Sequence, residues 1–200
     1  AGIDVRPADG MLYALVEDGT VVTVDPATGK ATMKSKLETM VKKGATVTVD
    51  FNPVADRMRV IGSDGMNLRA NVDDGKVAVD GAIKFKEGDA AAAKPAMVIA
   101  GAYSNSVKGA KETALYDIDM SGAFTKQAPP NDGVLSSMGA TGIKGKTVAF
   151  DIVAGADGSN TGWLVDEGMA YKLDIATGKT MPQGKITGLA GDVRDIAVLN

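Results

Sequence analysis

Four aspartates sit at equivalent positions of a short stretch that recurs along the chain, and they are the side chains best placed for chemistry. Each is followed directly by an apolar residue, whereas the third copy of the stretch carries Ala102 instead. If these copies are innermost strands of a repeated architecture, the carboxylates gather near one axis. They then repel one another unless a cation, an arginine or backbone amides compensate them. The aspartates are Asp4, Asp50, Asp151 and Asp195.

Two interpretations of these aspartates stay open. As metal ligands they would hold Ca²⁺ or another hard divalent cation, because such cations prefer carboxylate oxygens. As structural groups, each would accept hydrogen bonds from amides of the next repeat, or pair with Arg6 or Arg194. The cation is the one cofactor that the sequence suggests, and the fold does not require it.

Three arginines form a second candidate site. Arg57 and Arg59 lie two residues apart on one expected strand and so share a face, and Arg69 lies on the hairpin partner. Since arginine binds carboxylates and phosphates through two parallel hydrogen bonds, the three would suit an anion or a protein partner. The alternative is a set of salt bridges to Asp56, Asp64 or an aspartate of a neighbouring repeat.

Composition excludes several classes of chemistry. The chain of 200 residues has neither histidine nor cysteine, so serine–histidine triads, histidine metal sites and thiolate nucleophiles are ruled out. No catalytic residue is predicted. A net charge of -3 without a basic stripe argues against nucleic acid as a partner. No apolar run reaches the ~20 residues of a transmembrane segment.

The elements that carry these residues are short strands joined by glycine turns. Asp18-Gly19 and Asp64-Gly65 each separate two apolar runs, which is a strong hairpin signal. Four strands recur with a period of about 45–50 residues, the range of propeller blades. The sequence therefore predicts an all-β, β-propeller-like single domain over 1–200, built from four-stranded antiparallel blades. The repeats are approximately 1–46, 47–96, 97–146 and 147–191, with a partial repeat at 192–200.

The partial repeat has a consequence for partners. Val193–Leu199 is expected to be the first strand of a fifth blade that has no hairpin after it. An unpaired edge strand invites association. We therefore expect residues 192–200 to join a strand of another copy, or of another protein, by β-addition.

The motifs also resemble those of a bacterial family, the domain of unknown function 4394, over essentially the whole chain. They are Gly2–Pro7, Leu12-Tyr13, Asp25–Gly29, Asp50–Pro53, Asp56–Val60 with Asn67–Asn71, Thr113–Asp119 and Pro129–Gly133. The resemblance implies a propeller-like β-repeat domain, often found in exported bacterial proteins, and implies no activity. Relatives usually carry two or three further strands before the equivalent of Gly2, and these would complete the fifth blade.

These observations predict a non-catalytic, exported binding or assembly module, located in the periplasm, outside the cell or on its surface. Cation stabilisation and self-association through the incomplete blade belong to the same prediction. The alternative is a metal-dependent hydrolase of lactonase or esterase type, with the four aspartates as ligands of a central metal.

Overall fold

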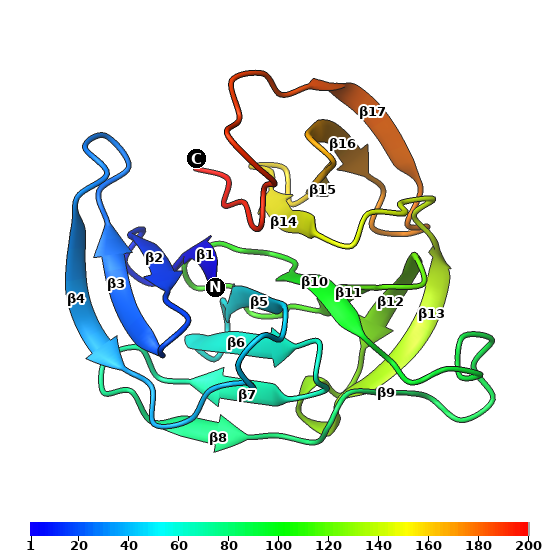
Figure 1. Cartoon of the computed structure of the whole chain (residues 1–200), viewed down its shortest axis with the longest axis horizontal. Coiled ribbons are helices and arrows are strands. Elements are labelled where there is room, and N and C mark those ends of the chain that lie inside the picture. Colours follow the sequence, from blue (N-terminus) through cyan, green and yellow to red (C-terminus); the bar gives the residue numbers. More distant parts are fainter. Residues whose placement is uncertain (200) are drawn as a thin grey trace.

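The computed structural model describes residues 1–199, and it is almost entirely β-structure. Four sheets, each built on four antiparallel strands consecutive in the chain, are arranged as blades around a common axis (Figure 1). In every blade the first strand lies innermost and the fourth lies outermost. The predicted propeller of four-stranded antiparallel blades is therefore confirmed.

The strands of the four blades have the following bounds. Blade 1 contains β1 (Gly2–Val5), β2 (Leu12–Leu15), β3 (Thr20–Val24) and β4 (Ala31–Lys36). Blade 2 contains β5 (Val47–Asn52), β6 (Arg57–Gly62), β7 (Asn67–Ala70) and β8 (Val77–Val79). Blade 3 contains β10 (Val98–Tyr103), β11 (Leu115–Asp119), β12 (Ala123–Gln127) and β13 (Val134–Ala140), with β9 (Lys84–Phe85) added in parallel at its outer edge. Blade 4 contains β14 (Val148–Ala154), β15 (Asn160–Asp166), β16 (Met169–Leu173) and β17 (Thr180–Lys185).

Glycine makes the tight turns between strands. Gly19, Gly65 and Gly168 adopt φ values of 87°, 85° and 75°, a region open to glycine and strained for other residues. These positions end the hairpin turns that the sequence predicts. One short 3₁₀ turn, Pro130–Asp132, lies in the connection between β12 and β13.

The core lies between blades, where the face of one sheet packs on the face of the next. Tyr13 of blade 1 meets Phe51 of blade 2 edge to face, with ring centroids 5.3 Å apart. Phe124 of blade 3 meets Phe150 of blade 4 in the same way at 6.3 Å. Each interface buries aromatic and aliphatic side chains, which is the main favourable term in holding neighbouring blades together.

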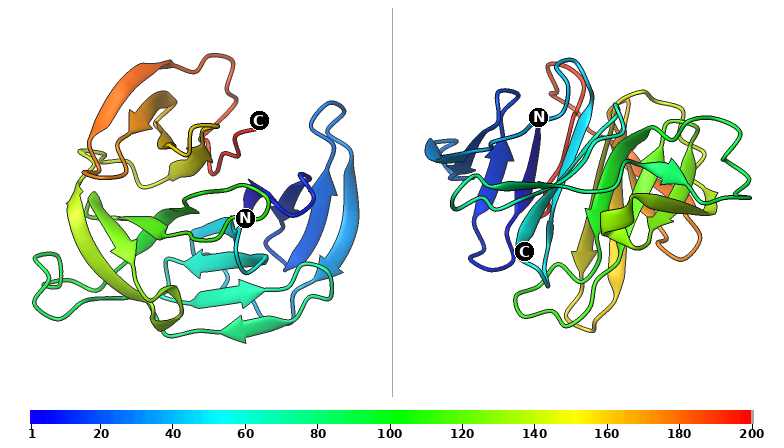
Figure 2. Two further views of the ribbon diagram at one scale, coloured as in Figure 1. Left: turned by 180° about the vertical axis from the view of Figure 1, so that it is seen from behind. Right: turned by 90° about the horizontal axis from the view of Figure 1, so that it is seen from below.

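The ring of blades is open between blades 4 and 1. The inner strands pack in the order β1, β5, β10 and β14, and residues 193–199 run through the gap between β14 and β1 (Figures 1 and 2). The sequence places a strand at Val193–Leu199, but these residues are irregular. A strand needs a backbone partner, and in the described part of the chain this segment has none.

No helix within residues 1–199 is long and apolar enough to cross a membrane.

Candidate functional site

Three of the four predicted aspartates meet on the axis. Asp4 from β1, Asp50 from β5 and Asp151 from β14 are buried, and each offers one carboxylate oxygen within 4.8 Å of those of the others. The inner strands position them, because each aspartate occupies the same place on its strand and faces the same way. Ala102 of β10 interrupts the ring and leaves this inner strand without a carboxylate.

Backbone amides of neighbouring inner strands and of the C-terminal segment donate to these carboxylates. Asp4 accepts a hydrogen bond of 2.6 Å from the amide of Phe51, and Asp50 accepts one of 3.1 Å from the amide of Tyr103. Asp151 accepts one of 2.7 Å from the amide of Val198. Asp4 and Asp50 thus tie their own inner strands to the next one, and Asp151 ties β14 to the C-terminal segment, which is the hydrogen-bonding part of the structural interpretation.

The fourth aspartate is not one of the three whose carboxylate oxygens lie within 4.8 Å of one another. Asp195 accepts hydrogen bonds from the amides of Ile3, at 2.9 Å, and Ile196, at 3.0 Å. It therefore joins the C-terminal segment to β1.

The two arginines considered as partners for these aspartates point elsewhere. Arg6 forms salt bridges with Asp9, Asp56 and Asp73, at 3.3, 2.6 and 2.9 Å. Arg194 pairs with Glu17 at 3.3 Å, with both side chains exposed. The pairing of axial aspartates with Arg6 or Arg194 is thus absent from residues 1–199.

Burial and mutual repulsion alter the acidity of the axial groups. Burial, and then the neighbouring carboxylate of Asp151, raises the pKa of Asp4 well above its ordinary value. Burial, followed by Asp4, does the same to the pKa of Asp50. Burial also raises the pKa of Asp151, and it raises the pKa of Asp195 to about 8. The cluster is therefore poised to hold either protons or a compensating cation.

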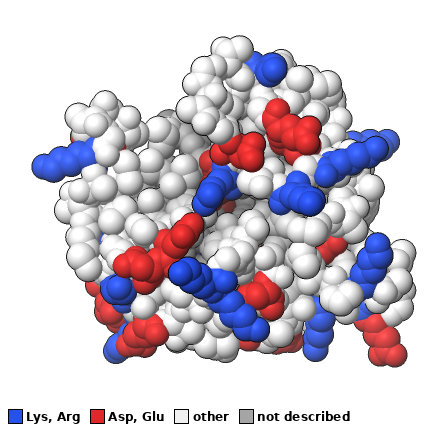
Figure 3. Space-filling view, viewed as in Figure 1, with Lys and Arg blue, Asp and Glu red and all other residues white. Residues whose placement is uncertain are grey.

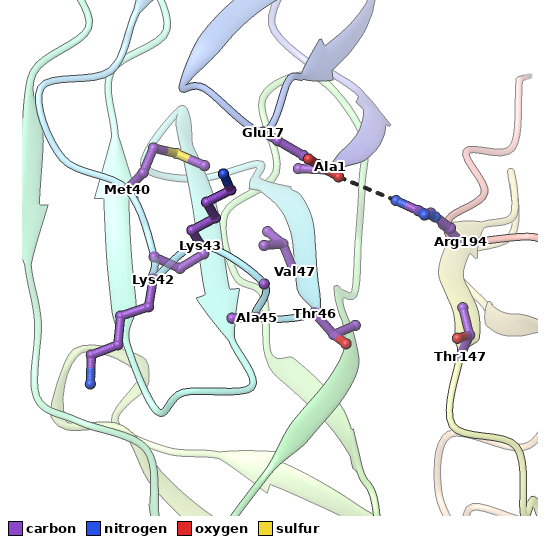
Figure 4. A pocket seen from close by; sticks show the side chains of 12 residues that line it. Ala1, Glu17, Met40, Lys42, Lys43, Ala45, Thr46, Val47, Thr147 and Arg194 are labelled. Carbon is purple, nitrogen blue, oxygen red and sulfur yellow. Dashed lines mark hydrogen bonds and ion pairs between the residues drawn. The ribbon is translucent and has the colours of Figure 1, made fainter.

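A cavity lies at each end of this axial region. One cavity, of about 350 Å³, lies beside Ala1, Thr147 and the connection formed by residues 40–47. The ion pair of Glu17 and Arg194 forms part of its lining (Figure 4). The other, of about 280 Å³, is lined at the opposite ends of β1 and β14 by residues that include Asp4, Asp151 and Lys108. Two of the three carboxylates, those of Asp4 and Asp151, thus border this second cavity.

The arginines form a different arrangement. Arg59 and Arg69 lie opposite each other on β6 and β7 and share Asp80, each at 2.6 Å. Arg59 is buried and also donates to Tyr103 of blade 3. Burial raises the pKa of Asp80, but hydrogen bonds from Arg69 and Arg59 outweigh it and hold that pKa below its ordinary value.

Arg57 does not join that cluster. Its guanidinium donates to the backbone carbonyls of Ala55 and Asp56, next to it in the chain. Together with Arg69 and Lys76 it lines a shallow surface depression. The predicted arginine set is thus divided between a buried ion-pair network and a partly exposed surface.

Two buried carboxylates were missed by sequence reasoning. Asp80 closes the arginine network, and its place just after β8 could have suggested this role. Asp117 lies on β11 fully buried, and neither of its oxygens has a hydrogen-bond partner within the described chain. Burial raises the pKa of Asp117 to about 8 although Arg59 nearby lowers it. Its sequence context, a strand of alternating apolar and polar residues, gave no sign of this environment.

The fold and the ring of inner strands define the protein as a β-propeller. The chain belongs to the family described as Domain of unknown function (DUF4394), whose match covers residues 1–197. No curated protein matches it.

Two solved structures from Bacteroides thetaiotaomicron share the fold. The first is a structural genomics protein of unknown function, with a TM-score of 0.59 and 18% identity, over 98% of this chain and 53% of that chain. The second is described as an auxiliary nutrient binding protein, with a TM-score of 0.50 and 16% identity, over 82% of this chain and 44% of that chain. The chain thus spans about half the length of these proteins.

Proposed function

We propose that this protein is a non-catalytic binding or assembly module that associates with other polypeptide through its incomplete blade. The carrying observation is the C-terminal segment 193–199, which lies in the inner-strand position between β14 and β1 without a backbone partner. The second structural neighbour is described as an auxiliary nutrient binding protein, and a binding role agrees with that description.

Self-association is the simplest form of this activity. Size-exclusion chromatography with light scattering, across a range of protein concentrations, should show oligomers whose formation protects the amides of residues 193–199 from hydrogen exchange. A monomer at all concentrations, with these amides already protected, would count against it.

We further propose that Ca²⁺ or a similar hard cation binds at Asp4, Asp50 and Asp151. Its support is the convergence of three buried carboxylates that otherwise repel one another. Calorimetric titration of chelator-treated protein with Ca²⁺ should release or absorb heat and raise the melting temperature. Asp50→Asn should abolish the response, whereas Asp157→Asn, in an exposed turn, should keep it. Absence of heat in the unmodified protein rejects the proposal.

Export to the periplasm or cell surface is part of the same proposal, and it rests on the family resemblance. Fractionation of cells that express the native gene should place the protein outside the cytoplasm. Recovery in the cytoplasmic fraction alone would contradict this location.

A metal-dependent hydrolase is the second candidate. The observation in its favour is the cavity of about 280 Å³ that Asp4 and Asp151 border. Lactone and ester substrates, tested with Ca²⁺-loaded protein and with Asp50→Asn, distinguish the two functions. Hydrolysis that is lost in the variant would support the enzyme, and equal rates in both proteins would exclude it.

A further inference from the structure

A shallow depression of about 350 Å³ lies over the strands β6, β7 and β8 of blade 2. The strand register brings basic side chains to it. Arg59 lies opposite Arg69, so Arg57, two residues before Arg59, lies on the same face of the sheet as Arg69. Lys76 comes just before β8, and its carbonyl accepts a hydrogen bond of 2.9 Å from the amide of Asn71, two residues beyond Arg69. Two strands and a turn thus each supply one cation to the depression.

Arg57 has no carboxylate partner within residues 1–199. Of the two aspartates that the sequence suggests for it, Asp56 accepts hydrogen bonds of 2.8 and 2.6 Å from Arg6. The other, Asp64, accepts them from backbone amides. Nη1 of Arg57 donates to the carbonyl of Asp56 at 2.7 Å, which holds the guanidinium in place. Its Nε and Nη2 donate to no group in the described chain. Arg57 therefore presents an unused fork of two donors.

Arg69 is fixed by a buried carboxylate. Its Nε and Nη2 donate to Asp80 at 2.6 and 2.9 Å, and the Asp80 side chain, which Arg59 shares, is only 6% exposed. Its Nη1 has no acceptor within residues 1–199, and the side chain as a whole is 36% exposed. A guanidinium that is already held in one position loses little conformational entropy when it binds a ligand.

The depression has an excess of positive charge. Its lining includes three cations and one carboxylate, that of Asp74, which gives a formal charge of +2. The buried pair of Arg59 and Asp80 adds no net charge. Asp74 accepts a hydrogen bond of 3.0 Å from the amide of Lys76, and the Lys76 ammonium forms no salt bridge within residues 1–199. On a protein whose net charge is -3, such a local excess attracts anions.

We propose that Arg57, Arg69 and Lys76 bind a phosphate group, either free or carried by a small molecule. Cations from three separate elements can approach different oxygens of a tetrahedral anion, whereas one guanidinium satisfies a planar carboxylate. A doubly charged phosphate also matches the formal charge of +2 in the lining. Acidic and basic side chains are interspersed on the face shown in Figure 3, without a continuous basic area, which agrees with a small ligand rather than a polyanion there.

This site is independent of the proposed function. None of its lining residues belongs to the axial aspartates or to residues 193–199. It adds a second binding activity, and the loss of either activity leaves the other in place.

Calorimetric titration with inorganic phosphate, at low ionic strength and with protein freed of divalent cations, tests the site. We expect saturable binding of one phosphate per chain that weakens as sodium chloride is added. Glycerol phosphate, tested in parallel, distinguishes the two sources of the phosphate group. Equal affinities would show that the site recognises the phosphate group alone, and tighter binding of the ester would show that it takes a phosphorylated small molecule.

Matched variants make the test specific. Arg57→Met should bind phosphate at least about tenfold more weakly, because it loses a charged fork of donors. Arg57→Lys keeps the charge without the fork and should bind about threefold more weakly. Lys76→Met should also lose about threefold, since its ammonium is exposed. Lys111→Met, at an exposed position in the loop between β10 and β11, should bind phosphate unchanged. Circular dichroism checks that all four variants are folded.

Three results would overturn the proposal: no saturable heat with phosphate, acetate binding as tight as phosphate binding, or full affinity in Arg57→Met. Equal losses in Lys76→Met and Lys111→Met would also overturn it, because binding would then follow net charge rather than this depression. None of these results bears on oligomer formation, which tests the proposed function separately.

Discussion

Arg59 is a buried cation whose guanidinium is fully engaged inside the protein. It donates to Tyr103, Asn67, Asp80 and Asn131, at distances between 2.6 and 3.2 Å. These partners come from blade 2, blade 3 and the connection between β12 and β13, so one side chain joins three segments. Removing such a group leaves the carboxylate of Asp80 buried with fewer donors.

We expect Arg59→Met to lower the free energy of unfolding by about 3–5 kcal/mol, the usual cost of breaking a buried ion pair. Arg57→Met is the matched control, since Arg57 donates only to nearby carbonyls, and it should cost about 0.5 kcal/mol or less. Urea unfolding monitored by circular dichroism measures both. Equal costs for the two variants would show that the buried network adds nothing to stability.

Asp117 should make stability depend on pH. Its pKa in the folded protein is about 8, above the ordinary 3.8 of the unfolded chain. As pH rises from 4 to 8 the unfolded state loses a proton that the folded state keeps, so the folded state is progressively destabilised.

The variant Asp117→Asn removes this titration. It should match the unmodified protein near pH 4 and exceed its stability at pH 8 by an amount on the order of a few kcal/mol. Urea unfolding at both pH values, compared between the two proteins, gives the difference. A difference that stays constant with pH would mean that Asp117 is paired in solution.

At the scale of elements, the C-terminal segment is held by hydrogen bonds to side-chain carboxylates rather than by the backbone hydrogen bonds of a β-sheet. We expect Asp195→Ala to speed hydrogen exchange of Ile3 and of residues 193–199 by about fivefold, the equivalent of one hydrogen bond. Asp192→Ala, at an exposed neighbouring position, should leave exchange unchanged. Unaltered exchange in Asp195→Ala would mean that other contacts fix the segment.

The strands and hairpins could be predicted from the sequence because local chemistry determines them. Asp-Gly turns and alternating apolar residues mark the hairpins wherever they occur. The short parallel strand β9 could not be predicted, since its partner β13 lies about one repeat further along the chain. Residues 193–199 have the pattern of a strand, yet a pattern cannot supply the missing neighbour.

The same distinction between local sequence pattern and contacts with distant segments applies to the candidate site. The repeat predicts that aspartates gather on the axis, and the two-residue spacing predicts that Arg57 and Arg59 share a face. Which carboxylate neutralises the arginines depends on contacts between distant segments. Periodicity therefore predicted the position of Asp4 and Asp50, but not the role of Asp80.

For the whole molecule, the axial carboxylates should couple stability to both pH and cations. Their raised pKa values mean that the folded state keeps protons that the unfolded state releases above about pH 4. Without divalent cations the melting temperature should therefore fall from pH 5 to pH 8. Ca²⁺ should raise the melting temperature again at pH 8. It should have little effect at pH 5, where protons occupy the carboxylates that would bind Ca²⁺.

Thermal melts in chelator and in Ca²⁺, at both pH values, measure this coupling. Asp50→Asn should show a shallower dependence on pH and a smaller response to Ca²⁺. A flat profile in the unmodified protein would indicate that amide hydrogen bonds alone compensate the cluster.

The open ring also determines how the molecule should respond to mechanical force. Blades 1 and 4 are each packed on one neighbouring blade, and across the gap they are joined through residues 193–199 by carboxylate–amide hydrogen bonds and one exposed ion pair. A pull applied at residues 1 and 199 would first break these few bonds at low force. It would then strip the blades inward from the two ends, one repeat at a time, as expected for a chain whose units contact only their neighbours. A closed ring would resist the same pull until several interfaces failed together.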